Sequence, residues 1–583
     1  MTRRLFAFLV ALCTTLVACA QSGNSGGQQA TQQQQTIKTQ HGMILQMGQP
    51  GPQANTPAPQ ASAGGSESAM LAEADRLLAT GHAADAQAKY QAVVNADPGS
   101  VPAQAGLGRS LIYQQKLDEA QAALNKALAR NPNAPDLFLT LGDLQFAQGK
   151  MPEAERSFVK AENLNPKNPA PYMALARVYR ACSLDRRSYD NMKRAHELAP
   201  NDLAVQLLWF HSLPQAQQVP ALESYLATPS LNPQVARALQ GYLAAVKRSA
   251  DAPVHPCKLV STVRETTTKL YAIARAGSAL GASGMTVKIN DQETHLALDT
   301  GSSGVLLGRA AAERLGLQKL GYHAIAGMGE GGEQGGYNAL ANKIRIGDLE
   351  FQDCTVRVTE AATPVTGQDG LVGTDVFSSY LIDIDIPGAK LRLSPLPKRP
   401  NAAEAPAALQ TVRDNQQFET EGGGKGGDLP QDAYVAPDMA NWTRVYRFRN
   451  LLMVPTKVDN IGPLLFLLDT GSFSNVLSTQ TARALTQVRS DPSMSIRGMS
   501  GNVGQVYRAD KATLIFGRYE QANQDVVTFD LSNISRTAGV QVAGILGYNM
   551  LRILQTKIDY RDGLVDFVFD AKHLPKQIKM SKQ

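Results

Sequence analysis

The feature that most constrains the fold of this chain is an internal duplication in its C-terminal half. The tetrapeptide Asp-Thr-Gly-Ser occurs at 299–302 and again at 469–472, and each copy follows an apolar run. Three further matches follow in the same order and at nearly the same offset: Gly327-Met328 with Gly498-Met499, Tyr337 with Tyr507, and 370–373 with 544–547. Because chance does not keep an offset nearly constant over such a length, the sequence predicts two copies of one fold.

Both copies have the local pattern of β-structure. Short β-like runs punctuated by glycine extend from 255 to 396 and from 441 to 572, as in all-β domains. The segment between them, 397–440, is rich in glycine and in Ala-Pro pairs, which is the composition of a linker. We therefore predict two β lobes joined by a linker and followed by a C-terminal tail at 573–583.

The duplicated motif resembles that of the pepsin and retropepsin superfamily of aspartic proteases, over about 260–395 and 445–570. The resemblance implies two acid-protease-like β-barrel lobes in which Asp299 and Asp469 are the catalytic pair. In such a pair one carboxylate activates a water molecule and the other carboxyl donates a proton. Two carboxyls about 3 Å apart cannot both ionise, so the pair keeps one shared proton.

The residues that follow each aspartate have supporting roles in this family. They are Thr300, Gly301, Ser302, Thr470, Gly471 and Ser472. Each glycine lets the backbone turn sharply after its aspartate. The resemblance implies that each threonine offers its hydroxyl to the opposite lobe and that each serine hydroxyl bonds the outer carboxylate oxygen. The apolar-Gly segments 371–373 and 545–547 are expected to pack behind the two loops.

Between its aspartate and its apolar-Gly segment, each copy contains a glycine-rich hairpin. These hairpins resemble the mobile flaps that cover substrate in retropepsins, and an ordinary long surface hairpin is the alternative. The candidate flap residues are Gly327, Met328, Gly329, Gly498 and Met499. Tyr337 and Tyr507 lie on the downstream arms, where we expect them to occupy a core or strand face rather than to contact substrate.

Residues 67–250 precede the lobes and carry an evenly spaced repeat. The repeated positions are Pro98, Pro132, Pro166 and Pro200, with Gly108 and Gly142, and with the alanines 86, 120 and 154 and 127, 161 and 195. The spacing resembles the period of about 34 residues that tetratricopeptide repeats have. It predicts an α-solenoid of about four helical hairpins up to residue 200, then further helix, with a concave surface for peptides or protein partners. An unrelated helical bundle is the alternative.

The first residues resemble a bacterial lipoprotein signal. A basic pair, Arg3-Arg4, precedes an apolar run at 5–18, and Leu16-Val17-Ala18 at its end is followed by Cys19. That ending resembles a lipobox, in which the cysteine is acylated, and the run is too short for a span that needs roughly 20 residues. We therefore predict a lipoprotein signal at 1–19 with lipid on Cys19. A plain secretory leader is the alternative.

The segment that follows the signal, 20–66, is rich in Gln, Gly, Ser, Ala and Pro. Such a composition buries too little apolar surface to offset chain entropy, so we predict a disordered tether. With the lipid anchor, this tether implies a protein held at the cell envelope and facing the periplasm. Ala20 after the cysteine favours the outer membrane.

Cysteines, charge and metal-ligand spacing limit the remaining functions. Cys257 and Cys354 are open to two interpretations, a bridge across one lobe or two buried free thiols. We find no metal-ligand spacing and expect no metal and no cofactor. A formal net charge of +6 over 583 residues, with no cluster of Lys, Arg and aromatic residues, argues against nucleic-acid binding.

Together these patterns predict a multidomain α plus all-β protein, a tetratricopeptide α-solenoid followed by two acid-protease-like lobes. The predicted function is that of a membrane-anchored aspartic endopeptidase that cuts protein or peptide substrates, with the repeats binding a substrate or protein partner. The lobes are expected to pair within one chain, and pairing between two chains is the alternative. A non-catalytic scaffold is the rival function, although decay would first erase the aspartates or their neighbours, and both motifs are intact.

Overall fold

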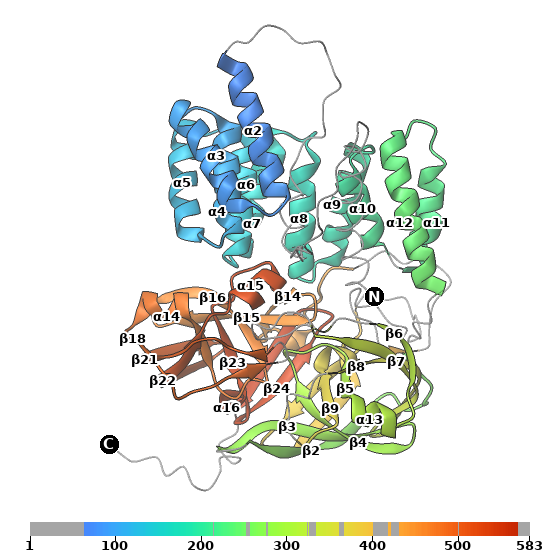
Figure 1. Ribbon diagram of the computed structural model, residues 1–583. Helices are drawn as coiled ribbons and strands as arrows, with labels where there is room; N and C mark the ends of the chain where they lie inside the picture. The colour runs from blue at the N-terminus through green and yellow to red at the C-terminus, as the bar shows by residue number, and fades with distance from the viewer. Residues whose placement is uncertain are drawn as a thin grey trace, which may run out of the picture. The chain divides into compact units, whose positions relative to one another are not determined.

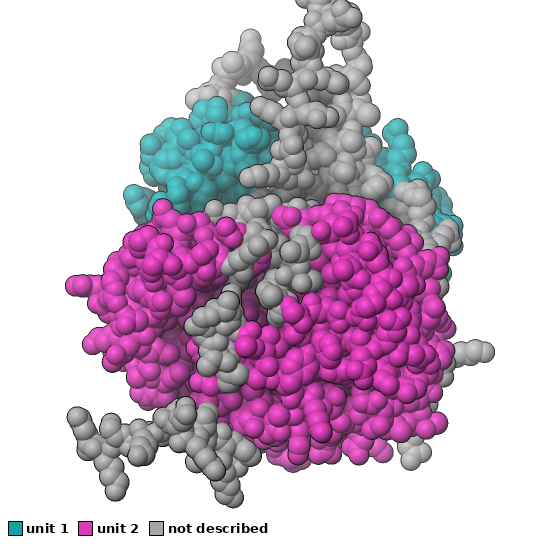
Figure 2. Space-filling model, turned by 60° about the horizontal axis from the view of Figure 1, so that its bottom comes forward, with its two compact units in different colours: residues 1–180, 186–252 teal, residues 181–185, 253–583 magenta. Residues whose placement is uncertain are grey.

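The computed structural model describes residues 63–213, 215–251, 257–275, 278–322, 325, 334–360, 367–399, 418–420, 431–498 and 501–569. The chain divides into two compact units, 1–180 with 186–252 and 181–185 with 253–583 (Figures 1 and 2). The predicted signal with Cys19, most of the predicted tether and the tail at 573–583 lie outside the described residues. Among the described residues, no helix combines the length and the apolarity needed to cross a bilayer.

The first unit is a stack of helical hairpins (Figure 1). Its helices are α2 (Ala63–Ala79), α3 (Ala83–Ala96), α4 (Val101–Tyr113), α5 (Leu117–Arg130), α6 (Pro135–Ala147), α7 (Met151–Leu164), α8 (Pro169–Ala181), α9 (Asp185–Leu198), α10 (Leu203–Ser212), α11 (Gln215–Leu226) and α12 (Pro233–Asp251). The starts of α4, α6 and α8 are evenly spaced along the chain, and those of α5, α7 and α9 have the same spacing. The predicted α-solenoid is confirmed.

Small residues of the repeat allow its helices to lie close together. A Cβ on Gly142 of α6 would lie 2.4 Å from the ring of Phe158, which is buried in α7. Glycine is therefore required where the ring packs on the backbone. One boundary differs from the prediction, because α2 begins at Ala63, inside the segment 20–66 that we predicted as a disordered tether.

The second unit contains two β lobes. Lobe 1 runs from green to yellow in Figure 1. Its elements are β1 (Cys257–Leu259), β2 (Thr266–Arg275), β3 (Ser278–Ile289), β4 (Gln292–Asp299), β5 (Val305–Gly308), α13 (Arg309–Arg314), β6 (Gln318–Tyr322), β7 (Gly336–Ile346), β8 (Leu349–Thr359), β9 (Gly370–Gly373), η2 (Thr374–Phe377), β10 (Tyr380–Asp385) and β11 (Lys390–Pro395).

Lobe 2 runs from orange to red in Figure 1. Its elements are η3 (Pro437–Met439), β13 (Thr443–Arg444), β14 (Tyr446–Phe448), β15 (Leu451–Val458), β16 (Ile461–Asp469), β17 (Val476–Ser478), α14 (Thr479–Leu485), β18 (Val488–Ser490), β19 (Arg497–Gly498), β20 (Gly501–Asn502), β21 (Val506–Phe516), β22 (Tyr519–Phe529), α15 (Ser532–Ala538), β23 (Gly544–Gly547), α16 (Tyr548–Leu551), β24 (Leu554–Asp559) and β25 (Leu564–Phe569). A short strand between the lobes, β12 (Phe418–Thr420), pairs in parallel with β1.

The two lobes share one strand arrangement around the duplicated motifs. In lobe 1, β9 pairs in parallel with β4 and antiparallel with β5, and β5 pairs in parallel with β8. In lobe 2, β23 pairs in the same way with β16 and β17, and β17 pairs in parallel with β22. The predicted fold class is therefore confirmed, and the sequence duplication corresponds to a duplicated fold.

The lobes are joined through a common sheet. Strand β10 of lobe 1 pairs antiparallel with β24 of lobe 2, and the buried side chains of Ile382 and Ile558 face each other across this pair. Each fully buried isoleucine contributes roughly 2 kcal/mol through the hydrophobic effect. The shared strands therefore hold the two lobes together independently of the linker.

The predicted linker, 397–440, is too long at both ends. Arg399 forms an ion pair with Asp562: Nη2 of Arg399 lies 2.6 Å from Oδ1 of Asp562. Both side chains are buried. The backbone N–H of Tyr434 donates to the same carboxylate at 2.8 Å, and Met439 is buried. These contacts make 397–399 and 431–440 part of the folded unit, because a buried ion pair and a buried methionine need a packed environment.

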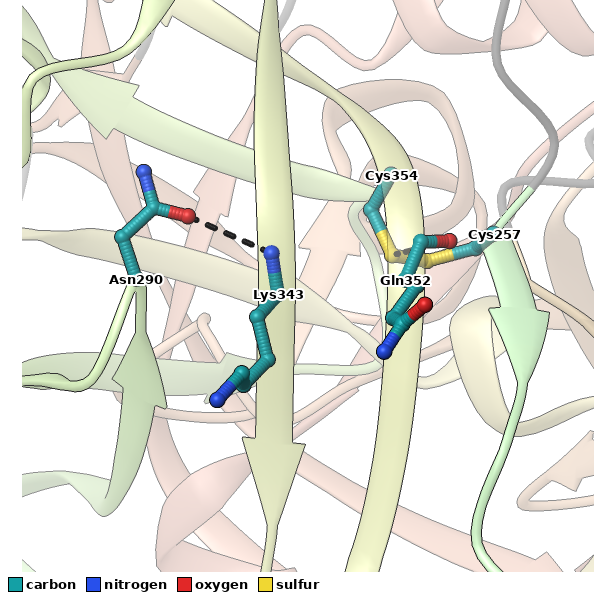
Figure 3. Close-up of a disulfide and its surroundings, with 5 residues drawn as sticks. All are labelled: Cys257, Asn290, Lys343, Gln352 and Cys354. Carbon is teal, nitrogen blue, oxygen red and sulfur yellow. Dashed lines mark hydrogen bonds between the residues drawn. A yellow bond between two sulfur atoms is a disulfide. The ribbon is translucent and has the colours of Figure 1, made fainter.

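A disulfide links Cys257 of β1 to Cys354 of β8 (Figure 3). Of the two interpretations of these cysteines, the structure has the bridged form. It spans a sequence separation of 97 residues, and closing a loop of this size stabilises the fold by about 4 to 5 kcal/mol in the chain-entropy account. Next to it in Figure 3, the N–H of Lys343 donates to the side-chain oxygen of Asn290 at 3.2 Å.

Candidate active site

The two aspartates occupy equivalent places at the ends of equivalent strands. Asp299 is the last residue of β4 and lies in register with Gly373 of β9. Asp469 is the last residue of β16 and lies in register with Gly547 of β23. The residues directly before them, 296–298 and 465–468, are apolar and buried, so each carboxyl lies where the chain leaves the core and turns through Thr-Gly-Ser.

The two loops meet within one chain. A Cβ placed on Gly301 would lie 2.7 Å from Cγ of Asp469, and a Cβ on Gly471 would lie 2.7 Å from Cγ of Asp299. Each carboxyl therefore contacts the backbone of the opposite loop, at a point where no side chain would fit. Of the two alternative pairings of the lobes, the structure has the pairing inside one chain.

Four reciprocal hydrogen bonds of the two threonines join the loops. The Thr300 hydroxyl donates to the carbonyl of Leu468 at 2.8 Å and accepts from the N–H of Thr470 at 2.9 Å. The Thr470 hydroxyl donates to the carbonyl of Leu298 at 3.0 Å and accepts from the N–H of Thr300 at 3.0 Å. Both threonines are buried, and each bond contributes about 1 kcal/mol. These bonds fix the two loops against each other, and therefore the distance between the two aspartates as well.

Backbone amides, rather than serine hydroxyls, contact the carboxyls. The N–H of Gly301 donates to Asp299 Oδ1 at 2.9 Å, and the N–H groups of Gly471 and Ser472 donate to Asp469 Oδ1 at 2.8 and 3.1 Å. The hydroxyl of Ser472 donates instead to the carbonyl of Ser474 at 3.1 Å. The expected hydroxyl contact is therefore wrong for Ser472, because the turn directs its N–H toward the carboxylate.

Both carboxyls are harder to ionise than an ordinary aspartate. Burial, together with the charge of Asp469 and a hydrogen bond to it, raises the pKa of Asp299 well above its usual range. Burial also raises the pKa of Asp469, although the hydrogen bond from Asp299 and the amide donors of Gly471 and Ser472 oppose this. Since the two groups face each other, they titrate as a pair and share a proton over an intermediate pH range.

Two polar residues that the sequence did not single out stabilise the loops from behind. Asp375, two residues after Gly373, accepts from the Ser303 hydroxyl at 2.6 Å and from the Gly304 N–H at 2.8 Å. In lobe 2 the contact runs the other way, because Asn475 on the loop accepts from the N–H of Gly547 at 2.9 Å. The position two residues after the glycine is polar in both copies, Asp375 and Asn549, and this was a sequence signal for Asp375 but not for Asn475.

The tips of the two glycine-rich hairpins are only partly described. Gly327, Met328, Gly329 and Met499 lie outside the described residues. On the lobe 1 side, the backbone groups of Ile325 and Gln334 exchange two hydrogen bonds of 2.9 and 2.7 Å. On the lobe 2 side, Gly498 of β19 pairs with Gly501 of β20. Both segments are therefore closed at their base as hairpins.

The tyrosines downstream of these hairpins lie on strand faces. Tyr337 is buried in β7, and the ammonium group of Lys319 lies 4.3 Å from the centre of its ring. Tyr507 of β21 is partly buried, and the guanidinium of Arg483 lies 5.5 Å from its ring centre. Both rings therefore have neighbours in their own lobe, as expected for a strand-face role.

Comparison with known proteins supports the duplication of the two lobes that their shared strand arrangement shows. A family model described as aspartyl protease matches residues 285–376 and 454–550, and each match contains one Asp-Thr-Gly-Ser segment. Both lobes are aspartyl protease-like domains. A family model described as tetratricopeptide repeat matches residues 105–169, which cover α5, α6 and α7, most of α4 and the first residue of α8.

Two solved structures are similar over part of the chain. One, titled as a functional characterisation of Pseudomonas aeruginosa PilF, has 18% identity and a TM-score of 0.24, and covers 32% of this chain and 87% of its own. The other, a crystal structure of MamA, has 17% identity and a TM-score of 0.21, and covers 30% of this chain and 94% of its own. No curated protein matches the chain.

Proposed function

We propose that this protein is an aspartic endopeptidase with one active site, formed by Asp299 and Asp469. The observation that supports the proposal is the contact of each carboxyl with the opposite loop. Cγ of Asp469 lies 2.7 Å from the position that a Cβ on Gly301 would occupy, and Cγ of Asp299 lies 2.7 Å from that of a Cβ on Gly471. The reciprocal threonine bonds hold this contact, and the family match covers both lobes. No residue of a second chain is needed to complete the pair.

The two carboxyls have different roles in the proposed mechanism. The amide donors of Gly471 and Ser472 favour the ionised form of Asp469, whereas burial and the neighbouring carboxylate favour the protonated form of Asp299. Asp469 takes a proton from a water molecule as the water oxygen attacks the peptide carbonyl carbon, and Asp299 donates its proton to the carbonyl oxygen. The tetrahedral intermediate, a gem-diol, then breaks its C–N bond as Asp469 passes its proton to the leaving nitrogen. One hydroxyl of the gem-diol returns a proton to Asp299, which leaves a carboxylic acid and restores the starting protonation of the pair.

The other parts of the chain fit a role in recruitment at a membrane. The lipobox-like ending at Cys19 supports lipid anchoring at the cell envelope, and the tether would hold the folded units off the surface. Helical repeats of this kind present a concave face that binds peptides or proteins. In this proposal the repeats recruit a protein partner or the substrate itself, and the lobes cut it.

The decisive experiment incubates the purified chain with a mixed peptide library from pH 3 to 8, with and without a statine-type transition-state mimic. Asp299→Asn and Asp469→Asn should each abolish cleavage. Asp385→Asn is the matched control and should keep full activity, because the Asp385 carboxylate accepts a hydrogen bond from the N–H of Gly388 in a turn and has no other hydrogen-bond partner among the described residues. The mimic should block cleavage by the unmodified protein.

Four outcomes would contradict the proposal in different ways. Full activity in both single dyad variants would exclude a shared pair, and cleavage that resists the mimic would exclude this mechanism. Absence of any cleavage across the pH range would favour a scaffold whose protease-like lobes bind without cutting. Activity that fell more steeply than enzyme concentration on dilution would indicate pairing between chains.

A further inference from the structure

A buried hydrogen bond links the support of Asp299 to the opposite lobe. Thr374 directly follows Gly373, the register partner of Asp299. Its hydroxyl lies 2.7 Å from the hydroxyl of Tyr560, which belongs to lobe 2 and directly follows β24. The exposed fractions of Thr374 and Tyr560 are 0% and 1%, so water does not compete for this bond.

The segment that contains Thr374 is also attached to the loop of Asp299. Asp375, the next residue, accepts hydrogen bonds from Ser303 and Gly304, which follow the Asp-Thr-Gly-Ser segment. Segment 373–375 is therefore linked to Asp299 in two ways, through the strand register of Gly373 and through the loop residues that Asp375 binds. A displacement of Thr374 would reach Asp299 through both.

Tyr560 is well placed to act as a fixed point. Its carbonyl accepts a hydrogen bond from the guanidinium of Arg447 at 2.8 Å, and its ring lies in the common hydrophobic core of the two lobes. Burial, with the nearby charges of Asp375 and Asp299, raises the pKa of the Tyr560 phenol. The hydroxyl therefore stays protonated and remains a hydrogen-bond partner wherever an aspartic dyad works.

The equivalent position in lobe 2 makes a longer contact. Tyr548 directly follows Gly547, the register partner of Asp469, and its hydroxyl accepts from the hydroxyl of Ser283 in lobe 1 at 3.3 Å. Each aspartate thus has a support that reaches the other lobe. The bond of Thr374 with Tyr560 is shorter by about 0.6 Å, and it is expected to be the stronger of the two.

We propose that Tyr560 is a positioning residue for Asp299, acting through Thr374, and that it sets the place of this carboxyl relative to Asp469. This inference rests on the proposed function. A shift of an aspartate by a fraction of an ångström disturbs the alignment of carboxyls, water and peptide bond, to which catalysis is steeply sensitive. It would leave substrate binding nearly unchanged, since Tyr560 is buried behind the loops.

The test is a double-mutant cycle measured on peptide cleavage. Tyr560→Phe and Thr374→Val should each lower kcat about tenfold with KM within twofold of the unmodified value. The double variant should be no slower than either single variant, because both substitutions remove the same hydrogen bond, that between Thr374 and Tyr560. Thr374→Ser keeps the hydroxyl and should retain most of kcat.

Tyr380→Phe is the matched control. Tyr380 is buried in β10, and its hydroxyl has no hydrogen-bond partner among the described residues. Its removal should leave kcat unchanged. Thermal unfolding of all variants separates the two roles, since a purely structural Tyr560 would lower Tm and leave the kcat of the folded enzyme intact, which would overturn the inference.

Two further outcomes keep this inference distinct from the proposed function. Additive losses in the double variant would show that Tyr560 does not act through Thr374. If the unmodified protein cleaves nothing, the proposed function fails, and the positioning is then judged from crystal structures of the unmodified protein and Tyr560→Phe. An unchanged separation of the Asp299 and Asp469 carboxyl carbons would overturn it, and a shift of several tenths of an ångström would support it.

Discussion

Adding one methyl group to Gly301 tests whether the two aspartate loops are in contact as the structure has them. In Gly301→Ala the new carbon would lie 2.7 Å from Cγ of Asp469 and 2.8 Å from its Oδ1. Ordinary contact begins at 3.4 Å, so one loop must move by about 0.7 Å. The movement cannot be absorbed freely, because the threonine bonds at 2.8 to 3.0 Å join the same loops.

The expected result is a large loss of rate in a protein that still folds. Overpacking of this kind costs roughly 1 to 3 kcal/mol of stability. A displacement of about 1 Å at a catalytic group can cost about a hundredfold in rate, so a shift of 0.7 Å should lower kcat by ten- to a hundredfold. Gly471→Ala should behave alike, since its new carbon would lie 2.7 Å from Cγ of Asp299.

The assay is kcat on a cleavable peptide, with Tm recorded for each variant. Gly99→Ala in the first unit is the control, because its added carbon meets only the exposed carboxylate of Asp97 at 3.1 Å, which can rotate away. It should change kcat by less than twofold. Full kcat in Gly301→Ala, with the fold intact, would refute the claim that the loops are in contact.

Two further predictions concern the stability of the second unit. Burial, with the charge of Asp562, raises the pKa of Asp559 to about 7. Its contribution to stability is therefore present below pH 4 and is lost as pH rises toward 7, by up to about 4 kcal/mol at roughly 1.4 kcal/mol per pKa unit. Asp559→Asn should flatten this decline in denaturant unfolding from pH 4 to 8, and an unchanged slope would contradict it. A protease site inserted within 421–427 should, once cut, leave two pieces that co-elute in gel filtration, because β10 and β24 pair across the lobes; separation of the pieces would show that the linker holds them.

Several features could be predicted from sequence because each is a local pattern repeated at a constant spacing. The even period of the prolines and alanines implies the helical hairpins, since every repeat meets only its neighbours. The nearly constant offset between matching segments, beginning with the two Asp-Thr-Gly-Ser copies, implies the duplicated β lobes. Other features could not be predicted from the sequence, among them the extent of the linker. Asp562 binds Arg399 near one end of the predicted linker and the N–H of Tyr434 near the other, and both ends are therefore folded.

The details of the candidate site could not be predicted either, because they depend on turn geometry and on contacts between distant residues. The hydroxyl of Ser472 was expected on the carboxylate, but the geometry of the turn presents the N–H instead. The sequence does contain a signal for Asp375, since a polar residue stands two positions after the glycine in both copies. Its role is clear only from the hydrogen bond that Asp375 accepts from Ser303. The choice between bridged and free cysteines was open until β1 and β8 proved to be paired neighbours.

By itself, the sequence determined the classes of fold, the order of the domains and the two segments that carry the carboxyls. Only the tertiary structure decided that these segments meet within one chain and that Tyr560 contacts Thr374, a partner far away in sequence. Local preference and periodicity depend on near neighbours, so they can be read along the chain. Contacts between distant residues depend on how the two lobes pack, and the shared strands β10 and β24 set that packing.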